Sequence, residues 1–136
     1  MNLKLVENNK EYYEIIRLLR TDPNNTQGFL EQVEITSEQQ NKYMEKYEKN
    51  YWVCLLDNDP VGFVGVIDTD IRFAVNPNYK NKGIGTFMIN ELKRKKIDMT
   101  SKVLLSNPSS QKVFEKCGFE LYKQDNKFKY YKRINN

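Results

Sequence analysis

The chain has 136 residues, enough for one domain with a single core, which we expect to span residues 1–136. Its formal net charge of +4 suits a small polyanion and is too mild to indicate nucleic acid, and the absence of histidine excludes His-based triads, HExxH zinc sites and imidazole bases. Two well-separated cysteines, and no apolar run of the ~20 residues that cross a bilayer, predict a cytoplasmic protein without a metal site or membrane contact.

The first 50 residues predict one short strand and two helices. Residues 2–6 alternate in polarity as a strand does, and apolar residues then recur at helical spacing. Two capping signals, Asn8 with Glu11 and Thr36 with Gln39, mark helix starts. A Pro and Asn turn and an irregular segment separate the helices. The expected elements are a strand over 2–6 and helices over 9–20 and 37–49.

The rest of the chain alternates strands with helices. Apolar, β-rich runs on either side of residues 57–60 predict a hairpin. Asn107 is a good helix N-cap, Pro108 suits the first helical position, and Gly118 suits the position just after a helix end. The expected elements are strands over 51–56, 61–67, 71–75, 102–106, 119–123 and 127–133, a helix after Gly83, and a helix from Pro108.

The segment over 76–86 joins a predicted strand to a predicted helix through a pair of glycines. The first turn of a helix leaves backbone N–H groups without partners and carries about half a positive charge, so it can bind an anion. Gly83 and Gly85 would keep side chains away from those amides, and Lys80 and Lys82 add positive charge. The spacing fits neither a P-loop nor a dinucleotide fingerprint. We therefore predict a phosphate-bearing ligand, held mostly by main chain.

Two motifs in this chain resemble those of the GNAT N-acetyltransferase superfamily. The first, the acetyl-CoA pyrophosphate loop, matches at Val75, Pro77, Gly83, Ile84 and Gly85. It departs at Lys80, where Arg or Gln is usual, and at Asn81, where Gly is common. The second motif matches at Asn107, Glu115, Lys116, Gly118 and Phe119. It departs at Ser110 and Phe114, which stand where Ala and Tyr are usual. Two motifs in the right order are far more specific than either alone.

The resemblance implies an α+β fold, in an α/β three-layer architecture. A mixed, mostly antiparallel sheet would be flanked by helices, in the order strand, two helices, three strands, helix, strand, helix, two strands. The fourth and fifth strands would splay apart around acetyl-CoA, with residues 73–75 along its pantetheine arm. The residues implied to bind the coenzyme are Phe73, Ala74, Val75, Lys80, Asn81, Lys82, Gly83, Ile84, Gly85, Thr86, Asn107, Ser110 and Phe114.

The proton donor is left open by the resemblance. In many family members a tyrosine at the position of Phe114 is the general acid, and phenylalanine cannot donate a proton. Water or another group would then protonate the leaving thiolate, unless that step proceeds unassisted. The candidate donors are Tyr79, Tyr122, Tyr130 and Tyr131, and we take Tyr122 as the catalytic candidate.

The base that removes the ammonium proton is also open. Without histidine a carboxylate is expected, acting directly or through water, unless the amine arrives neutral. The resemblance points to Asp70, near the start of the fourth strand, with Asp68 next. Strand alternation places Asp70 on the face opposite Phe73, unless a β-bulge reverses it. Lys102 stands where the branch that acetylates ribosomal protein N-termini carries a glutamate, which counts against that branch's mechanism.

The resemblance implies that the acceptor meets the segment between the first two helices, and Phe29, Glu31 and Glu34 are the candidate substrate-binding residues. The predicted function is acetyl-CoA-dependent N-acetylation of a primary amine of a small molecule, such as an amino sugar or a nucleotide-linked amino sugar. A protein or peptide N-acetyltransferase and a non-catalytic acyl-CoA-binding module are the alternatives. The expected partners are acetyl-CoA and the amine, and a homodimer is left open.

Overall fold

Seven strands and four α-helices make up the computed structural model, which describes residues 2–22 and 34–135. The strands are β1 Leu3–Glu7, β2 Tyr51–Leu56, β3 Asp59–Ile67, β4 Asp70–Val75, β5 Met99–Leu104, β6 Glu120–Gln124 and β7 Phe128–Arg133. The α-helices are α1 Tyr13–Thr21, α3 Ser37–Tyr47, α4 Ile84–Arg94 and α5 Pro108–Lys116. Short 3₁₀ turns are η1 Lys10–Tyr12, η2 Glu48–Asn50 and η3 Pro77–Tyr79.

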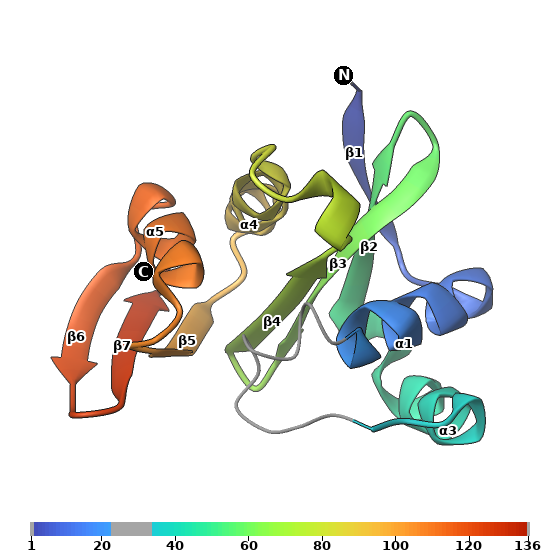
Figure 1. The fold of residues 1–136 in the computed structure, drawn as a ribbon, viewed down its shortest axis with the longest axis horizontal. Helices are drawn as coiled ribbons and strands as arrows, with labels where there is room; N and C mark the ends of the chain where they lie inside the picture. The colour runs from blue at the N-terminus through green and yellow to red at the C-terminus, as the bar shows by residue number, and fades with distance from the viewer. Residues whose placement is uncertain (1, 23–33, 136) are drawn as a thin grey trace.

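The strands form one sheet in the order β1-β2-β3-β4-β5-β7-β6. Every pairing is antiparallel except that of β4 with β5, so the expected mixed, mostly antiparallel sheet is confirmed. The two strands of the parallel pair meet only at Asp70 and Thr100, where the Thr100 amide donates to the Thr69 carbonyl at 2.7 Å. Figure 1 shows β4 and β5 running apart from this end. The predicted splay is therefore present in the sheet.

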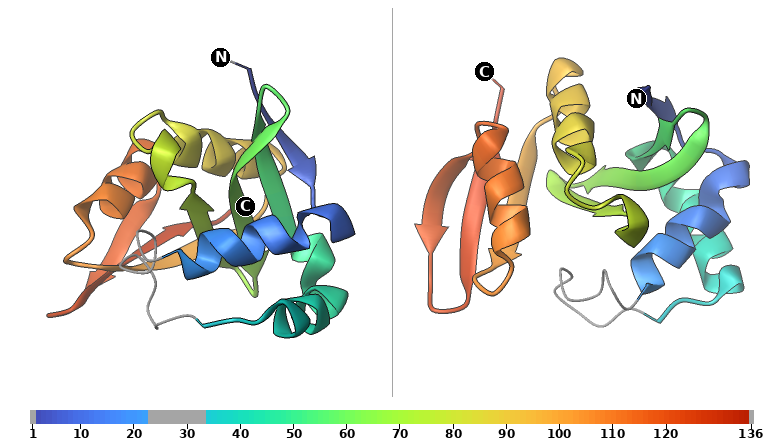
Figure 2. Two further views of the ribbon diagram at one scale, coloured as in Figure 1. Left: turned by 45° about the vertical axis from the view of Figure 1, so that its right-hand side comes forward. Right: turned by 45° about the horizontal axis from the view of Figure 1, so that its top comes forward.

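Helices cover the two faces of the sheet in different places. Apolar residues of α4 and α5 pack on one face in a cluster that includes Met88, Leu92 and Phe114. Residues of α1 and α3 pack on the other face in a second cluster that includes Ile16 and Met44. Figure 2 shows α4 and α5 lying apart from α1 and α3. The two faces of the sheet are called the α4/α5 face and the α1/α3 face after the helices that pack on them.

Two tight turns connect β2, β3 and β4. Asp57 and Asn58 have φ of 48° and 76°, and Asp68 and Thr69 have φ of 50° and 69°. Two successive residues with positive φ are typical of the two-residue turn that matches the twist of antiparallel strands, and Asp and Asn tolerate this conformation. The first turn is thus two residues long, and β3 begins at Asp59 rather than at the predicted residue 61.

Two sequence predictions about element starts are corrected. The first helical turn is 3₁₀ and is capped by Asn9, whose side chain accepts from the Glu11 amide at 2.8 Å. Asn8 was predicted as the cap; it is buried instead and donates to the Glu48 carbonyl at 3.3 Å, which ties β1 to the end of α3. The fifth strand begins at Met99, three residues before the prediction, because residues 99–104 pair continuously with β7.

None of the helices in the described residues has the length and apolar character of a membrane span. Within the same residues, no three carboxylate or thiol groups lie close enough together to hold a metal ion.

Candidate functional site

The loop before α4 presents main chain at the helix N-terminus. Gly83 is the N-cap residue, in a left-handed conformation with φ of 77°, and the helical ladder begins with the bond from the Phe87 amide to the Gly83 carbonyl at 2.9 Å. A glycine offers no side chain to cap the first-turn amides, which helix geometry leaves without partners inside the helix. Lys80, Asn81 and Lys82 are exposed at the same end. The loop is thus open, cationic and rich in amides, as an anion site requires.

The two glycines of this loop serve different purposes. A Cβ at Gly83 would meet no atom within 4 Å, so this glycine is needed for its positive φ and leaves open space in front of the helix. A Cβ at Gly85 would lie 3.1 Å from Cε2 of Phe73, and Gly85 is buried. Gly85 thus lets α4 pack closely on β4, and its expected role in clearing the path to the amides stays a prediction.

The gap between the splayed strands β4 and β5 is called the β4–β5 opening. Along β4, successive side chains lie on alternate faces of the sheet at this opening. Its pairing with β3 runs without a register shift from Ile67 and Asp70 to Gly62 and Val75, so no β-bulge reverses its alternation. Phe73 consequently packs with the α4/α5 cluster and Ala74 with the α1/α3 cluster. By the same alternation Asp70 and Arg72 belong to the α1/α3 face, and Arg72 Nη2 donates to Asp70 Oδ2 at 2.7 Å.

Phe114 packs across the gap between β4 and β5 on the α4/α5 face. It is 2% exposed, and its ring contacts those of Phe73, Phe119 and Tyr131 at centroid distances of 5.8, 5.0 and 5.8 Å. The contact with Phe73 links α5 to β4 across the gap between β4 and β5. Tyr131 is fully buried behind it, and burial, followed by the hydrogen bond from its Oη to Glu115, raises its pKa. Neither ring is therefore suited to deliver a proton to this opening.

Asn107 and Ser110 lie together at the start of α5. The Asn107 side chain accepts from the Ser110 amide at 3.3 Å, and its Nδ2 donates to Ser110 Oγ at 3.1 Å. The predicted cap is therefore present. Both residues are partly exposed beside the splayed strands, since α5 follows β5 directly.

Tyr122, predicted as a catalytic tyrosine, lies away from the opening. It belongs to the edge strand β6, at a register shift against β7, and it is 47% exposed. Strands β5 and β7 stand between β6 and β4 in the sheet. The structure therefore does not bring Tyr122 to the β4–β5 opening. Sequence alone could not show this, because the order of the last three strands depends on their pairing.

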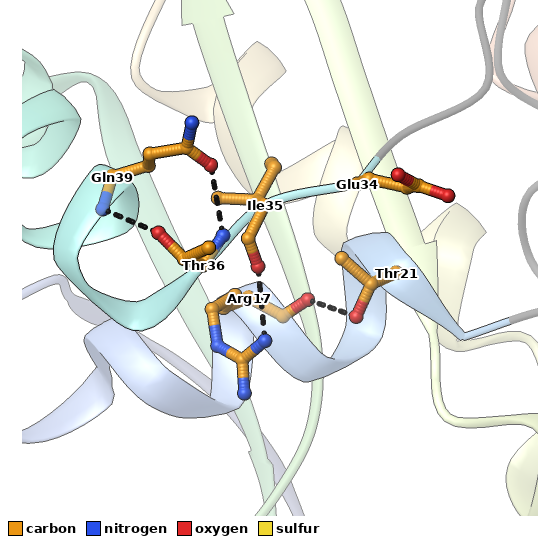
Figure 3. Close-up of a pocket in the computed structure, with 6 residues that line it drawn as sticks. All are labelled: Arg17, Thr21, Glu34, Ile35, Thr36 and Gln39. Carbon is orange, nitrogen blue, oxygen red and sulfur yellow. Dashed lines mark hydrogen bonds between the residues drawn. The ribbon is translucent and has the colours of Figure 1, made fainter.

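A pocket on the α1/α3 side lies between the end of α1 and the start of α3. Its volume is about 510 Å³, and its lining residues, shown in Figure 3, are Arg17, Thr21, Glu34, Ile35, Thr36 and Gln39. A second hollow of about 300 Å³ shares Glu34, Ile35 and Gln39 with it and adds Arg20, Gln40 and Tyr43. Of the three predicted acceptor residues, Glu34 lines both pockets. Phe29 and Glu31 lie outside the described residues.

Two tyrosines and two arginines connect this hollow to β4. The hydroxyl oxygens of Tyr43 and Tyr51 are 2.6 Å apart, and the Arg20 guanidinium lies 5.2 Å from the centre of the Tyr43 ring. Burial raises the pKa of Tyr51, the bond to Tyr43 adds to this, and Arg20 and Arg72 oppose it. Arg72 was missed as a candidate from the sequence; its place in the predicted strand 71–75, two residues after Asp70, was the available signal.

Comparison with known proteins agrees with this geometry. Residues 10–119 match the model of the acetyltransferase (GNAT) family. A GNAT-family acetyltransferase from Streptococcus pneumoniae superposes with a TM-score of 0.80 at 17% identity, covering 98% of this chain and 100% of that one. No curated protein matches the sequence.

Two further solved structures contain the coenzyme. Spermidine N-acetyltransferase from Vibrio cholerae, in complex with CoA and spermine, has a TM-score of 0.80 at 15% identity, with 96% of this chain and 92% of that chain covered. A phosphinothricin acetyltransferase from Sinorhizobium meliloti, in complex with AcCoA, has a TM-score of 0.81 at 16% identity, with 98% and 88% covered. At such identities these likenesses show the fold.

Proposed function

The chain belongs to the acetyltransferase (GNAT) family, and from that premise we propose that it transfers an acetyl group from acetyl-CoA to a primary amine of a small molecule. The observation that carries the proposal is the position of the α4 N-terminus. An open, cationic loop of main-chain donors stands at the end of β4, the strand that parts from its neighbour β5. A diphosphate on this loop would place the rest of a long ligand along the parted strands.

The residues of this chain fit the coenzyme. Open space in front of Gly83 lets a phosphate reach the first-turn amides, and Lys80 and Lys82 are exposed at that end of the helix. The partly exposed Asn107 and Ser110 and the edge of β4 would contact the arm between the strands, and Phe114 would back it on the α4/α5 face. When bound, acetyl-CoA supplies the thioester whose acyl group is transferred.

The residue that we propose as the general base lies on the α1/α3 face. Asp70 is the only carboxylate in β4 and β5, and it lies on that face at the end where the two strands still pair. We assign it the removal of the ammonium proton, directly or through water. Since Phe114 has no hydroxyl, the leaving thiolate would take its proton from water; a thiol of pKa near 8.5 is a tolerable leaving group.

The acceptor is an amine that reaches the pockets beside Glu34. An amino sugar or a nucleotide-linked amino sugar is one class, and the two coenzyme-containing relatives, named for spermidine and phosphinothricin, show how widely acceptors vary among proteins of this fold. A non-catalytic acyl-CoA-binding module is the second candidate. The observation that favours it is the burial of Phe114 in place of a donor.

Thermal unfolding with and without acetyl-CoA tests the binding half of the proposal. A ligand that binds only the native state raises its stability, by about 2.7 kcal/mol at one hundred times its Kd. We expect a clear rise in Tm. No change at millimolar acetyl-CoA would refute the whole assignment.

Release of free CoA thiol in the presence of a panel of amines then separates an enzyme from a binding module. Amine-dependent release, abolished or strongly reduced by Asp70→Asn, is the expected result; loss of a general base costs about 10²- to 10⁴-fold. Binding of acetyl-CoA with only background release for every amine would favour the module.

A further inference from the structure

The packing of the described residues favours one face of the sheet as the side from which the acceptor arrives. Helix α4, whose N-terminus is the proposed phosphate site, packs on the α4/α5 face, and the Phe73–Phe114 contact spans the gap between β4 and β5 on that face. An amine that attacks a thioester held between β4 and β5 would therefore arrive from the α1/α3 face. The side chains on that face of the two strands decide what the acceptor looks like.

Strand register identifies those side chains. Residues paired across neighbouring strands have their side chains on the same face. Asp70 pairs with Thr100, so the next positions on this face are Arg72 on β4 and Lys102 on β5, two residues beyond the last contact between the strands. Arg72 and Lys102 thus lie on opposite sides of the β4–β5 opening, at the end where the two strands begin to separate. Both side chains are cationic, one on β4 and one on β5.

Both cations have neighbours that hold them in place, and both remain at least partly exposed. Arg72 is held by Asp70 and by the Tyr51 hydroxyl, and 30% of its side chain is exposed. Lys102 is exposed, and its Nζ lies 4.1 Å from the centre of the Phe128 ring and 5.9 Å from that of Tyr130, on the neighbouring β7. Within the described residues, no carboxylate forms an ion pair with Lys102.

On this face of β4, β5 and β7, cations outnumber carboxylates. On the same face of β7, Lys132 pairs with Thr100 in the sheet and has the Glu120 carboxylate at 4.0 Å. Asp70 is the one carboxylate on this face of β4 and β5, and it offsets a single cation. A polyamine would place its second positive charge against Arg72 and Lys102, whereas an acceptor with a negative group would gain two charge-assisted hydrogen bonds.

The geometry points to an acceptor that carries a carboxylate or a phosphate close to its primary amine, with Arg72 and Lys102 binding the anionic group as specificity residues. This inference rests on the proposed function, since it names the acceptor class of that reaction. It places an amino acid or a phosphorylated amino sugar ahead of an uncharged amino sugar and ahead of a polyamine.

Matched pairs of amines test the inference through thiol release. The carboxylate arm compares an amino acid with its amide, and the phosphate arm compares glucosamine 6-phosphate with glucosamine; spermidine is the cationic reference. We expect kcat/KM to be at least about tenfold higher for the anionic member of one pair, the value of one good ionic hydrogen bond. Equal use of both members in both arms, or a preference for spermidine, would overturn the inference.

Variants connect the preference to the two residues. Lys102→Gln should lower kcat/KM for the anionic amine about tenfold, mainly through KM, and leave the uncharged partner unchanged. Arg72→Gln should also lower kcat/KM more for the anionic amine than for its uncharged partner; because Arg72 binds Asp70, both amines are affected, and the ratio of the two values is the readout. Thermal unfolding shows whether this variant folds. Lys123→Gln is the matched control, because Lys123 is an exposed β6 lysine 4.9 Å from the Tyr130 ring. A preference that survives Lys102→Gln intact would contradict the assignment.

A binding experiment separates failure here from failure of the proposed function. The protein loaded with CoA is titrated with the same matched amines by calorimetry, which needs no turnover. Tighter binding of the anionic amine, lost in Lys102→Gln, would support the inference even if no amine were acetylated. Equal binding of both members by the unmodified protein would refute it while leaving acetyl transfer intact.

Discussion

The two faces of the central sheet differ in what they bury. The α4/α5 face is packed almost wholly by apolar and sulfur-containing side chains, among them Phe114, Met88 and both cysteines. The α1/α3 face holds apolar residues too, but also a network of tyrosine hydroxyls, arginines and a carboxylate. The first arrangement is closely packed and suits a cosubstrate of constant shape. The second offers charges and hydrogen bonds that can select an acceptor.

Phe114→Ala should have the largest effect, because this ring joins α5, β4 and β7 at the centre of the α4/α5 face. Truncating a buried phenylalanine costs about 3–5 kcal/mol, from lost transfer free energy and the cavity that remains. Urea unfolding measures it. Tyr122→Ala, at an aromatic residue 47% exposed on the edge strand, is the control and should cost far less. Equal losses would mean that the α4/α5 face is not the tightly packed side.

The two faces should also respond differently to alkaline pH. On the α4/α5 face, burial, with a smaller effect of Glu91, raises the pKa of Cys54 from 9.0 to about 11. On the other face, burial and then the hydrogen bond to Glu48 raise the pKa of Tyr13 from 10.0 to about 12. Above pH 9 the unfolded chain loses the Cys54 proton while the folded protein keeps it, so the stability present below pH 9 falls as pH rises towards 11.

The Cys54 contribution can be isolated by substitution. We expect the unfolding free energy of the unmodified protein to lose on the order of 2 kcal/mol more than that of Cys54→Ala between pH 9 and 11. Tyr13→Phe should alter the profile only above pH 10. Chemical unfolding at a series of pH values, with reductant present, provides the measurement. Parallel profiles for the unmodified protein and Cys54→Ala would show that the thiol is not shielded.

Gly83→Ala should have a smaller effect, set by backbone conformation alone. The substitution adds a Cβ that meets no neighbour but must adopt φ of 77°, which costs about 1–2 kcal/mol. Asparagine tolerates this conformation, so Gly83→Asn should recover much of the loss. Thermal unfolding of both variants measures the two stability losses. If alanine and asparagine are equally destabilising, a steric clash rather than backbone strain governs the position.

The sequence predicted the α4/α5 face better than the other. Its motifs, from Gly83 to Gly85 and from Asn107 to Phe119, are contiguous in the chain, so local rules place them on a helix start and on one helix. The α1/α3 face is assembled from side chains far apart in sequence, such as Tyr43, Tyr51 and Arg72, and only the strand register brings these together. Tyr122 failed as a candidate for the same reason.

The smallest expected effect is that of a substitution at Tyr122, which lies away from the β4–β5 opening. Tyr122→Phe removes a hydroxyl from the edge strand, with β7 and β5 between it and the opening, so kcat and KM should stay within about twofold of the unmodified protein. A tyrosine that donates the proton in the rate-limiting step would lose about a hundredfold or more. Steady-state rates of thiol release distinguish the two. Tyr130→Phe is the informative companion, because Tyr130 pairs with Lys102 on the α1/α3 face and its Oη binds Asp125 at 2.9 Å. A large loss of kcat in Tyr122→Phe alone would mean that a side chain of β6 takes part in the reaction. The assignment of the coenzyme to the α4/α5 face and of acceptor selection to the α1/α3 face would then be wrong.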